Sequence, residues 1–117
     1  LQKSKPNQHF EGGIAEQFMV AAAGGLSLAG AIPFASTFGV FMTSRARGQA
    51  RLNDINETNV KMVSTHCGLS LGEDGPTHQA LDDFASMESL FNTTVIDCSG
   101  IASFIFFSPT LISFIVD

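Results

Sequence analysis

The sequence predicts an α/β fold, a partial doubly wound parallel sheet with crossover helices. Three observations predict it. The chain of 117 residues is 44% hydrophobic, short apolar runs recur along it, and segments of helical composition separate these runs. This length suffices for one domain with a packed core. Strands that alternate with helices form parallel sheets, because each crossover helix returns the chain to the edge where the previous strand began.

The first elements lie around a long uncharged stretch, residues 18–44. Its length alone is that of a membrane span. However, this stretch is interrupted by Gly24, Gly25, Gly30 and Pro33. We therefore expect a buried helix over 15–29, a tight turn, and a buried strand over 32–36. The strand shows no alternation of polar and apolar residues, which is typical of a strand covered on both faces.

The second half of the chain continues the alternation. The charged stretch 45–57 is typical of a surface helix, and residues 60–65 and 93–96 have strand composition. Between these two strands, Pro76 is expected to open a helix. Its apolar side is predicted to hold Ala80, Leu81, Phe84, Ala85 and Met87, and its polar side Asp82, Asp83 and Ser86.

The end of the chain, residues 101–116, is uncharged, rich in Phe and Ile, and broken by Pro109. It is compatible with a strand pair, a buried helix or a marginal membrane anchor, although it is short for a span. The composition does not choose between them.

The charge balance excludes one class of partner. The chain has six Lys and Arg residues against 11 Asp and Glu residues, and Lys61 is the last basic residue in the sequence. A nucleic-acid surface needs clustered basic side chains, so we expect no nucleic-acid binding. The two cysteines fit neither a disulfide framework nor a CxxC knuckle, and no signal-peptide core is visible at the N-terminus. We expect a cytoplasmic protein without a membrane segment.

Glu16 is the first candidate for chemistry, because it opens the first helix among apolar neighbours, Ile14, Ala15 and Met19. As a structural residue it is an acid in the first helical turn, where the helix dipole favours it, and position alone favours this interpretation. As a functional residue it is a carboxyl group in a dry pocket that shares a proton with a ligand nitrogen.

Two further groups of candidates follow the predicted strands, at the sheet edge where ligands bind in such folds. Phe38 and Phe41 have the spacing of a core pair, but at a strand end they also suit a platform for a flat ring. The loop 64–79 carries His66, Glu73, Asp74 and His78 among glycines. It lacks the spacing of a metal site, the partners of a nucleophilic triad and the ending of a P-loop. A polar lining for a hydroxylated ligand and a solvated turn both remain open.

Three segments together resemble the transketolases, specifically their pyrimidine-binding domain. They read GIAEQ at 13–17, IPFASTF at 32–38, and THCG at 65–68 leading into GEDGPTHQ at 72–79. The resemblance runs from about residue 10 to residue 95. It implies a partial pyrimidine-binding domain over 1–98 and a divergent hydrophobic tail over 99–117.

The resemblance also implies roles for the candidates. Glu16 is expected to act in catalysis by bonding a ring nitrogen of the thiamin diphosphate aminopyrimidine, and Phe38 and Phe41 to surround that ring. The implied reaction, part of the pentose phosphate pathway, transfers a two-carbon ketol unit from a ketose phosphate to an aldose phosphate. The side chains expected to line the sugar-phosphate channel are His66, Asp74 and His78.

The same resemblance implies that the chain is one half of a site. In this family a separate domain holds the diphosphate and its Mg²⁺ or Ca²⁺. The signature of that domain is Gly-Asp-Gly followed by Asn. Residues 73–75 with Asn92 resemble it but have the wrong spacing, so the resemblance assigns no metal ligand to this chain. We expect a partner domain or subunit in a homodimer or heterodimer, and no activity from the chain alone. The alternatives are a catalytically silent fragment that acts as a dimerisation module, and a small membrane protein that uses 18–44 and 101–116.

Overall fold

The computed structural model describes residues 2–98 and 112–116. Its four strands form one parallel sheet in the order β1-β2-β4-β3. The strands are β1 (Phe34–Phe38), β2 (Lys61–Thr65), β3 (Thr93–Asp97) and β4 (Ile112–Val116). The predicted parallel α/β sheet is therefore confirmed, and three strands lie within two residues of their expected positions.

Strand β4 lies between β2 and β3, so the end of the chain contributes a central strand. Of the alternatives for residues 101–116, the described part, Ile112–Val116, is a strand. Residues 101–111 lie outside the described residues, and the division of the chain after residue 98 stays a prediction.

The helices are α1 (Glu16–Leu28), α2 (Gly39–Thr43), α3 (Arg47–Ile55) and α4 (Asp83–Glu88), with short 3₁₀ helices η1 (Pro6–Gln8) and η2 (Gly72–Thr77). The uncharged stretch 18–44 is thus divided among α1, β1 and α2. In the described part of the chain, no helix has both the length and the apolar character that a membrane crossing requires.

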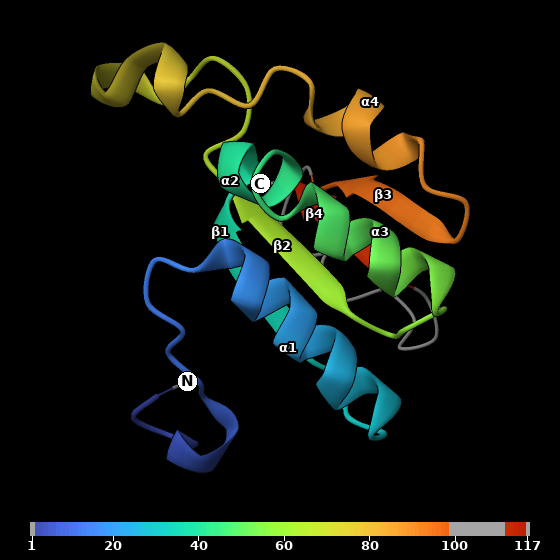
Figure 1. Ribbon diagram of the computed structural model, residues 1–117. Helices are drawn as coiled ribbons and strands as arrows, with labels where there is room; N and C mark the ends of the chain where they lie inside the picture. The colour runs from blue at the N-terminus through green and yellow to red at the C-terminus, as the bar shows by residue number, and fades with distance from the viewer. Residues whose placement is uncertain (1, 99–111, 117) are drawn as a thin grey trace.

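Helices α1 and α3 lie side by side in front of the sheet (Figure 1). They approach closely at Gly24, where a Cβ atom would lie 2.0 Å from Asn53 Oδ1. The Asn53 amide donates a hydrogen bond of 3.0 Å to the Val20 carbonyl. This contact explains why position 24 of the first helix is a glycine.

The core lies between the sheet and the helices, and α2 and α4 contribute Met42 and Met87 to it. In the register of the sheet, Ala35 of β1 lies beside Met62 of β2, and both are buried. The buried core cluster is Val20, Ala23, Ala35, Met42, Ala46, Ala50, Val60, Met62, Met87 and Leu90. The prediction that β1 is covered on both faces is wrong, because Phe34 is 62% exposed while Ala35 is 2% exposed.

The prediction that a helix begins at Pro76 is also wrong. Residues 72–77 form η2, in which Gly75 has a left-handed φ of 70°, and α4 begins only at Asp83. Asp83, which was expected on the polar side, is buried in α4 together with Met87. Leu81, which was expected on the apolar side, precedes the helix and is exposed. Asp83 is satisfied locally, since its carboxylate accepts a 2.9 Å bond from the Phe84 N–H.

A buried carboxylate joins the end of α3 to the start of β3. Asp54 is 1% exposed. Its Oδ2 accepts the Phe91 N–H at 3.0 Å, and its Oδ1 accepts the Asn92 N–H and the Thr93 hydroxyl, both at 2.8 Å. Two N–H donors of the turn before β3 and the hydroxyl of its first residue are therefore satisfied by one side chain.

Candidate functional site

Four rings meet at the carboxyl ends of β1 and β2. Phe38 ends β1, Phe41 lies in α2, and the rings of these two residues are parallel within 4°, with centroids 6.0 Å apart. The His66 ring lies 4.3 Å from Phe38, and His78 lies edge-on to Phe41 at 5.2 Å and to Phe38 at 6.1 Å. The predicted sheet edge thus carries a cluster of flat side chains.

The backbone of the loop after β2 places the two histidines. The loop closes on itself where the Gly68 N–H donates to the Ala80 carbonyl at 2.9 Å. Its start packs on Gly39, where a Cβ atom would lie 2.5 Å from Cys67 Sγ. His66 adopts a φ of 56°, which is uncommon for a residue with a side chain and is typical of functional sites.

Each histidine is oriented by a preceding threonine hydroxyl. The Thr65 Oγ1–His66 Nδ1 distance is 2.9 Å, and the Thr77 Oγ1–His78 Nδ1 distance is 2.8 Å. Because Nδ1 is engaged in both rings, Nε2 is the nitrogen with which each histidine would bind a ligand.

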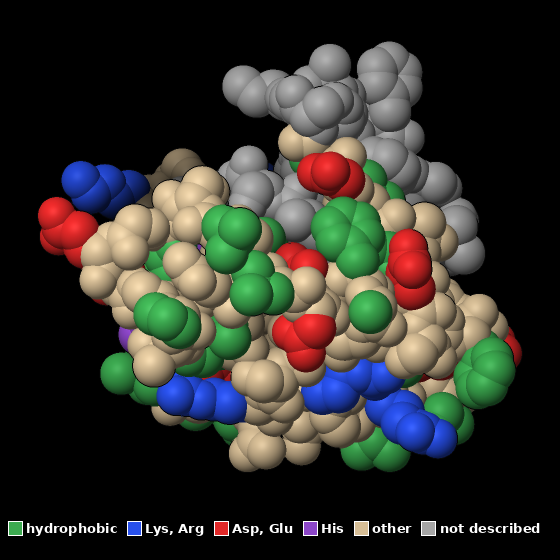
Figure 2. Space-filling model, turned by 90° about the horizontal axis from the view of Figure 1, so that it is seen from above, with side chains coloured by type: hydrophobic (Ala, Val, Ile, Leu, Met, Phe, Trp, Pro, Cys, Tyr) green, Lys and Arg blue, Asp and Glu red, His purple; other side chains and the backbone are tan. Residues whose placement is uncertain are grey.

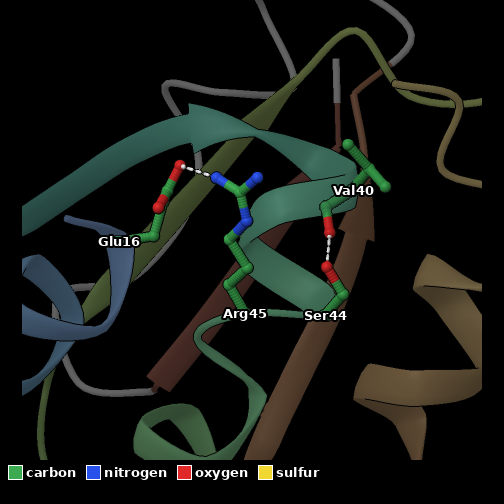
Figure 3. Close-up of polar contacts among 4 residues, drawn as sticks. All are labelled: Glu16, Val40, Ser44 and Arg45. Carbon is green, nitrogen blue, oxygen red and sulfur yellow. Dashed lines mark hydrogen bonds and ion pairs between the residues drawn. The ribbon is translucent and has the colours of Figure 1, made fainter. Parts of the chain in front are cut away.

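Glu16 is the first residue of α1 and is connected to this ring cluster through one arginine, Arg45. Its side chain is 11% exposed, and its Oε1 lies 3.3 Å from Arg45 Nη1 (Figure 3). The guanidinium carbon of Arg45 lies 4.3 Å from the centroid of the Phe41 ring. Glu16 and Arg45 line an open pocket of about 460 Å³ together with residues 14–18. The carboxylate is therefore nearly buried and is linked to the rings.

The structure brings together five of the six predicted site residues. The rings of four of them are in contact with one another: Phe38, Phe41, His66 and His78. Glu16 is connected to this group through Arg45. Asp74 stands apart: it is exposed on η2, which extends away from the sheet in Figure 1. The backbone carbonyl oxygen of Asp74 accepts a hydrogen bond from the Thr77 hydroxyl at 3.4 Å.

Arg45 is the residue that the sequence analysis missed, because it was assigned to a charged surface helix. It lies instead in the link between α2 and α3. Its position four residues after Phe41 is the available signal, since residues one helical turn apart lie on the same side.

The surface around the site is mixed in charge. Acidic and hydrophobic side chains are interspersed on the face shown in Figure 2, and basic ones lie along its lower edge and at its upper left. Within the described residues, no three His, Cys, Asp or Glu side chains gather as a metal site requires.

Comparisons with known proteins agree with the fold. Residues 1–104 match the family model "Transketolase, pyrimidine binding domain". The chain is 46% identical over 96 residues to transketolase-like protein 2 of Mus musculus, and 43% identical over 96 residues to the transketolase of Homo sapiens; each match covers 81% of this chain and 15% of the relative. It is 43% identical over 95 residues to a putative transketolase C-terminal section of Methanocaldococcus jannaschii, a match that covers 80% of this chain and 30% of the relative.

Two solved structures extend the likeness to the fold. A split gene transketolase, in an inactive beta4 tetramer, superposes with a TM-score of 0.84 at 36% identity, over 97% of this chain and 38% of that one. The transketolase of Leishmania mexicana gives 0.79 at 32% identity, over 89% and 16%. The chain thus spans between about a seventh and two fifths of the length of these relatives.

Proposed function

The chain belongs to the transketolase family, through its pyrimidine-binding domain, and from this premise we propose that it provides one half of a thiamin-diphosphate site. In this proposal it binds the aminopyrimidine half of the cofactor, and a partner domain or subunit binds the diphosphate and its Mg²⁺ or Ca²⁺. The reaction served is transfer of a two-carbon ketol unit between sugar phosphates.

The observation that carries the proposal is a nearly buried carboxylate that is joined through Arg45 to a pair of parallel aromatic rings. Glu16 is 11% exposed, and the Phe38 and Phe41 rings are parallel within 4°. An aminopyrimidine is a flat ring with nitrogens at its edge, so it needs a stacking face and a carboxyl group that exchanges a proton. The side chains present fit that group.

In this proposal each side chain has a defined task. The Glu16 carboxyl group holds a proton against the ring nitrogen and moves it during the reaction, while Phe38 and Phe41 fix the plane of the ring and exclude water. When bound, thiamin diphosphate supplies the nucleophilic carbon that carries the two-carbon unit. Orientation and proton sharing are the protein's contributions.

The sugar phosphates are proposed to meet the loop after β2. His66 and His78 present Nε2 from rings held by threonine hydroxyls, and such nitrogens bind phosphate or hydroxyl oxygens. Asp74 is proposed to bind a donor hydroxyl. Since Asp74 is exposed and apart from the rings, this role requires η2 to be positioned by substrate or by the partner.

The test is reconstitution with a chain that carries the diphosphate-binding domain of a transketolase, thiamin diphosphate and Mg²⁺. We expect ketol transfer by the mixture and none by either chain alone. Glu16→Gln is expected to lower turnover at least 100-fold, whereas Glu88→Gln, the same change on the exposed side of α4, is expected to leave it unchanged. Turnover without a partner would refute the half-site, and full turnover in Glu16→Gln would refute the role of Glu16.

A second function, a catalytically silent interaction module, is favoured by one observation. The outer side of α1 and its approach expose large apolar side chains: Ile14 is 93%, Phe18 65% and Leu28 68% exposed. Exposed apolar patches of this kind mark protein interfaces. Co-purification with a full-length transketolase, with thiamin affinity unaffected by Glu16→Gln or Phe38→Leu, would support this function over the first.

A further inference from the structure

The guanidinium of Arg45 makes two contacts at once. Its Nη1 lies 3.3 Å from Glu16 Oε1, and its central carbon lies 4.3 Å from the centroid of the Phe41 ring. A guanidinium is planar, stacks on aromatic faces and donates N–H bonds within its own plane. One flat cation therefore covers an aromatic face and pairs with one oxygen of the carboxylate.

These two contacts are the ones that a flat heterocycle would need in the same place. A ring bound at Glu16 has its face against the aromatic pair and its edge toward the carboxylate. At 4.3 Å from the Phe41 centroid the guanidinium is already in van der Waals contact. A bound ring and the guanidinium in this position therefore exclude one another.

The surroundings of Arg45 let its side chain leave without moving a helix. It stands in the link between α2 and α3, where the Ser44 hydroxyl donates back to the Val40 carbonyl (Figure 3) and Ala46 is fully buried. The backbone is thus fixed on both sides. The Arg45 side chain itself is 52% exposed, so it can turn outward into solvent.

We propose that Arg45 is a latch on the ring-binding place: its guanidinium occupies the space between Glu16 and Phe41 in the empty chain and is displaced when an aminopyrimidine binds. This inference rests on the proposed function, since it concerns the same place. The latch keeps the carboxylate paired and the aromatic face covered until the cofactor arrives.

The experiment measures the affinity of the chain for 4-amino-2-methylpyrimidine, the flat half of the cofactor alone, by NMR titration of the backbone amides. A half-exposed ion pair and a cation–π contact are each weak, and together they correspond to about a tenfold reduction in affinity. Arg45→Met, which keeps the aliphatic stem, is therefore expected to bind the probe about tenfold more tightly than the natural chain. Arg51→Met, the same change at an exposed position of α3, is expected to change nothing.

Two additional measurements separate the latch from a general effect of charge. Arg45→Lys keeps the positive charge and loses the plane, so we expect an affinity between those of the natural chain and Arg45→Met. Methylguanidinium added to Arg45→Met is expected to compete with the probe, because it fits the vacated place. Lack of competition would count against the latch.

The possible failures are distinct. If the natural chain and Arg45→Met bind the probe equally, or Arg45→Met binds it less tightly, the latch is overturned and ring binding stands. If neither chain binds the probe, the proposed function is overturned, and the latch with it.

Discussion

Asp54 gives the sharpest test of what holds this chain together. Its carboxylate, 1% exposed, accepts the Phe91 and Asn92 N–H groups and the Thr93 hydroxyl at 2.8 to 3.0 Å. In Asp54→Asn, one oxygen can keep two of these bonds. The new amide group then faces the Phe91 N–H, so a donor meets a donor.

The expected loss follows from these three bonds. A lost hydrogen bond to a charged group costs about 1.5–3 kcal/mol, and the two remaining bonds lose the charge assistance that roughly doubles their strength. We expect the free energy of unfolding to fall by about 3 kcal/mol, a large part of the roughly 5–15 kcal/mol of an ordinary domain. With a urea dependence of about 1.5 kcal/mol per molar, the midpoint of urea unfolding falls by about 2 M.

The control removes the same charge without removing buried bonds. Asp82 is exposed, and no side-chain bond from it caps α4, so Asp82→Asn is expected to change the free energy by less than about 0.5 kcal/mol. The measurement is urea unfolding of the three chains followed by circular dichroism. Equal midpoints for Asp54→Asn and Asp82→Asn would refute the claim that this carboxylate anchors β3 to α3.

Three further predictions follow from single contacts. Gly24→Ala places a Cβ atom 2.0 Å from Asn53 Oδ1 and is expected to lower the free energy of unfolding by about 2 kcal/mol. Gly25→Ala, whose Cβ atom meets nothing within 4 Å, is expected to raise it slightly, and the melting temperatures of the two variants test both expectations. Burial lowers the pKa of Lys61 below 10.5, so between the lowered pKa and 10.5 the unfolded chain binds more protons than the folded one and stability rises with pH. Lys61→Met is expected to abolish this rise, and melting temperatures measured from about pH 8 to 10.5 decide it. Phe38→Leu removes one stacking ring and is expected to weaken aminopyrimidine binding about threefold to tenfold, and an unchanged affinity in the NMR titration would contradict the stacking role.

The elements that the sequence predicts well are those with local signals. The Ala- and Gly-rich helix predicted over 15–29 is found at Glu16–Leu28. Its ends are predictable because glycines mark them and its composition is uniform between them. The strands at 60–65 and 93–96 are β-branched runs between turn residues, and they appear as β2 and β3 within one residue. These signals need no knowledge of distant contacts.

The errors arise where distant contacts or a single backbone angle decide. The expectation of a helix from Pro76 ignored Gly75, whose left-handed φ of 70° separates η2 from α4. The role of Arg45 depends on Glu16, 29 residues earlier in the chain, and no local pattern reports such a contact. Of the site, the ring cluster was predictable from strand ends. Of the two contacts of Arg45, the one with Phe41, four residues earlier, has a local signal, and the one with Glu16 has none.

The number and positions of the basic side chains give a physical reason for a site in two halves. A diphosphate carries several negative charges, and a protein binds it with basic side chains, a metal or helix N-termini. The six basic residues of the chain are Lys3, Lys5, Arg45, Arg47, Arg51 and Lys61. Lys61 is buried in β2, Arg47 donates to two serine hydroxyls, and Arg45 faces the carboxylate of the ring site. The basic side chain beside the ring cluster, Arg45, pairs with Glu16 in this structure and, in the latch proposal, turns outward into solvent when an aminopyrimidine binds. In the half-site proposal, the diphosphate then extends toward a partner chain that supplies most of its positive charge.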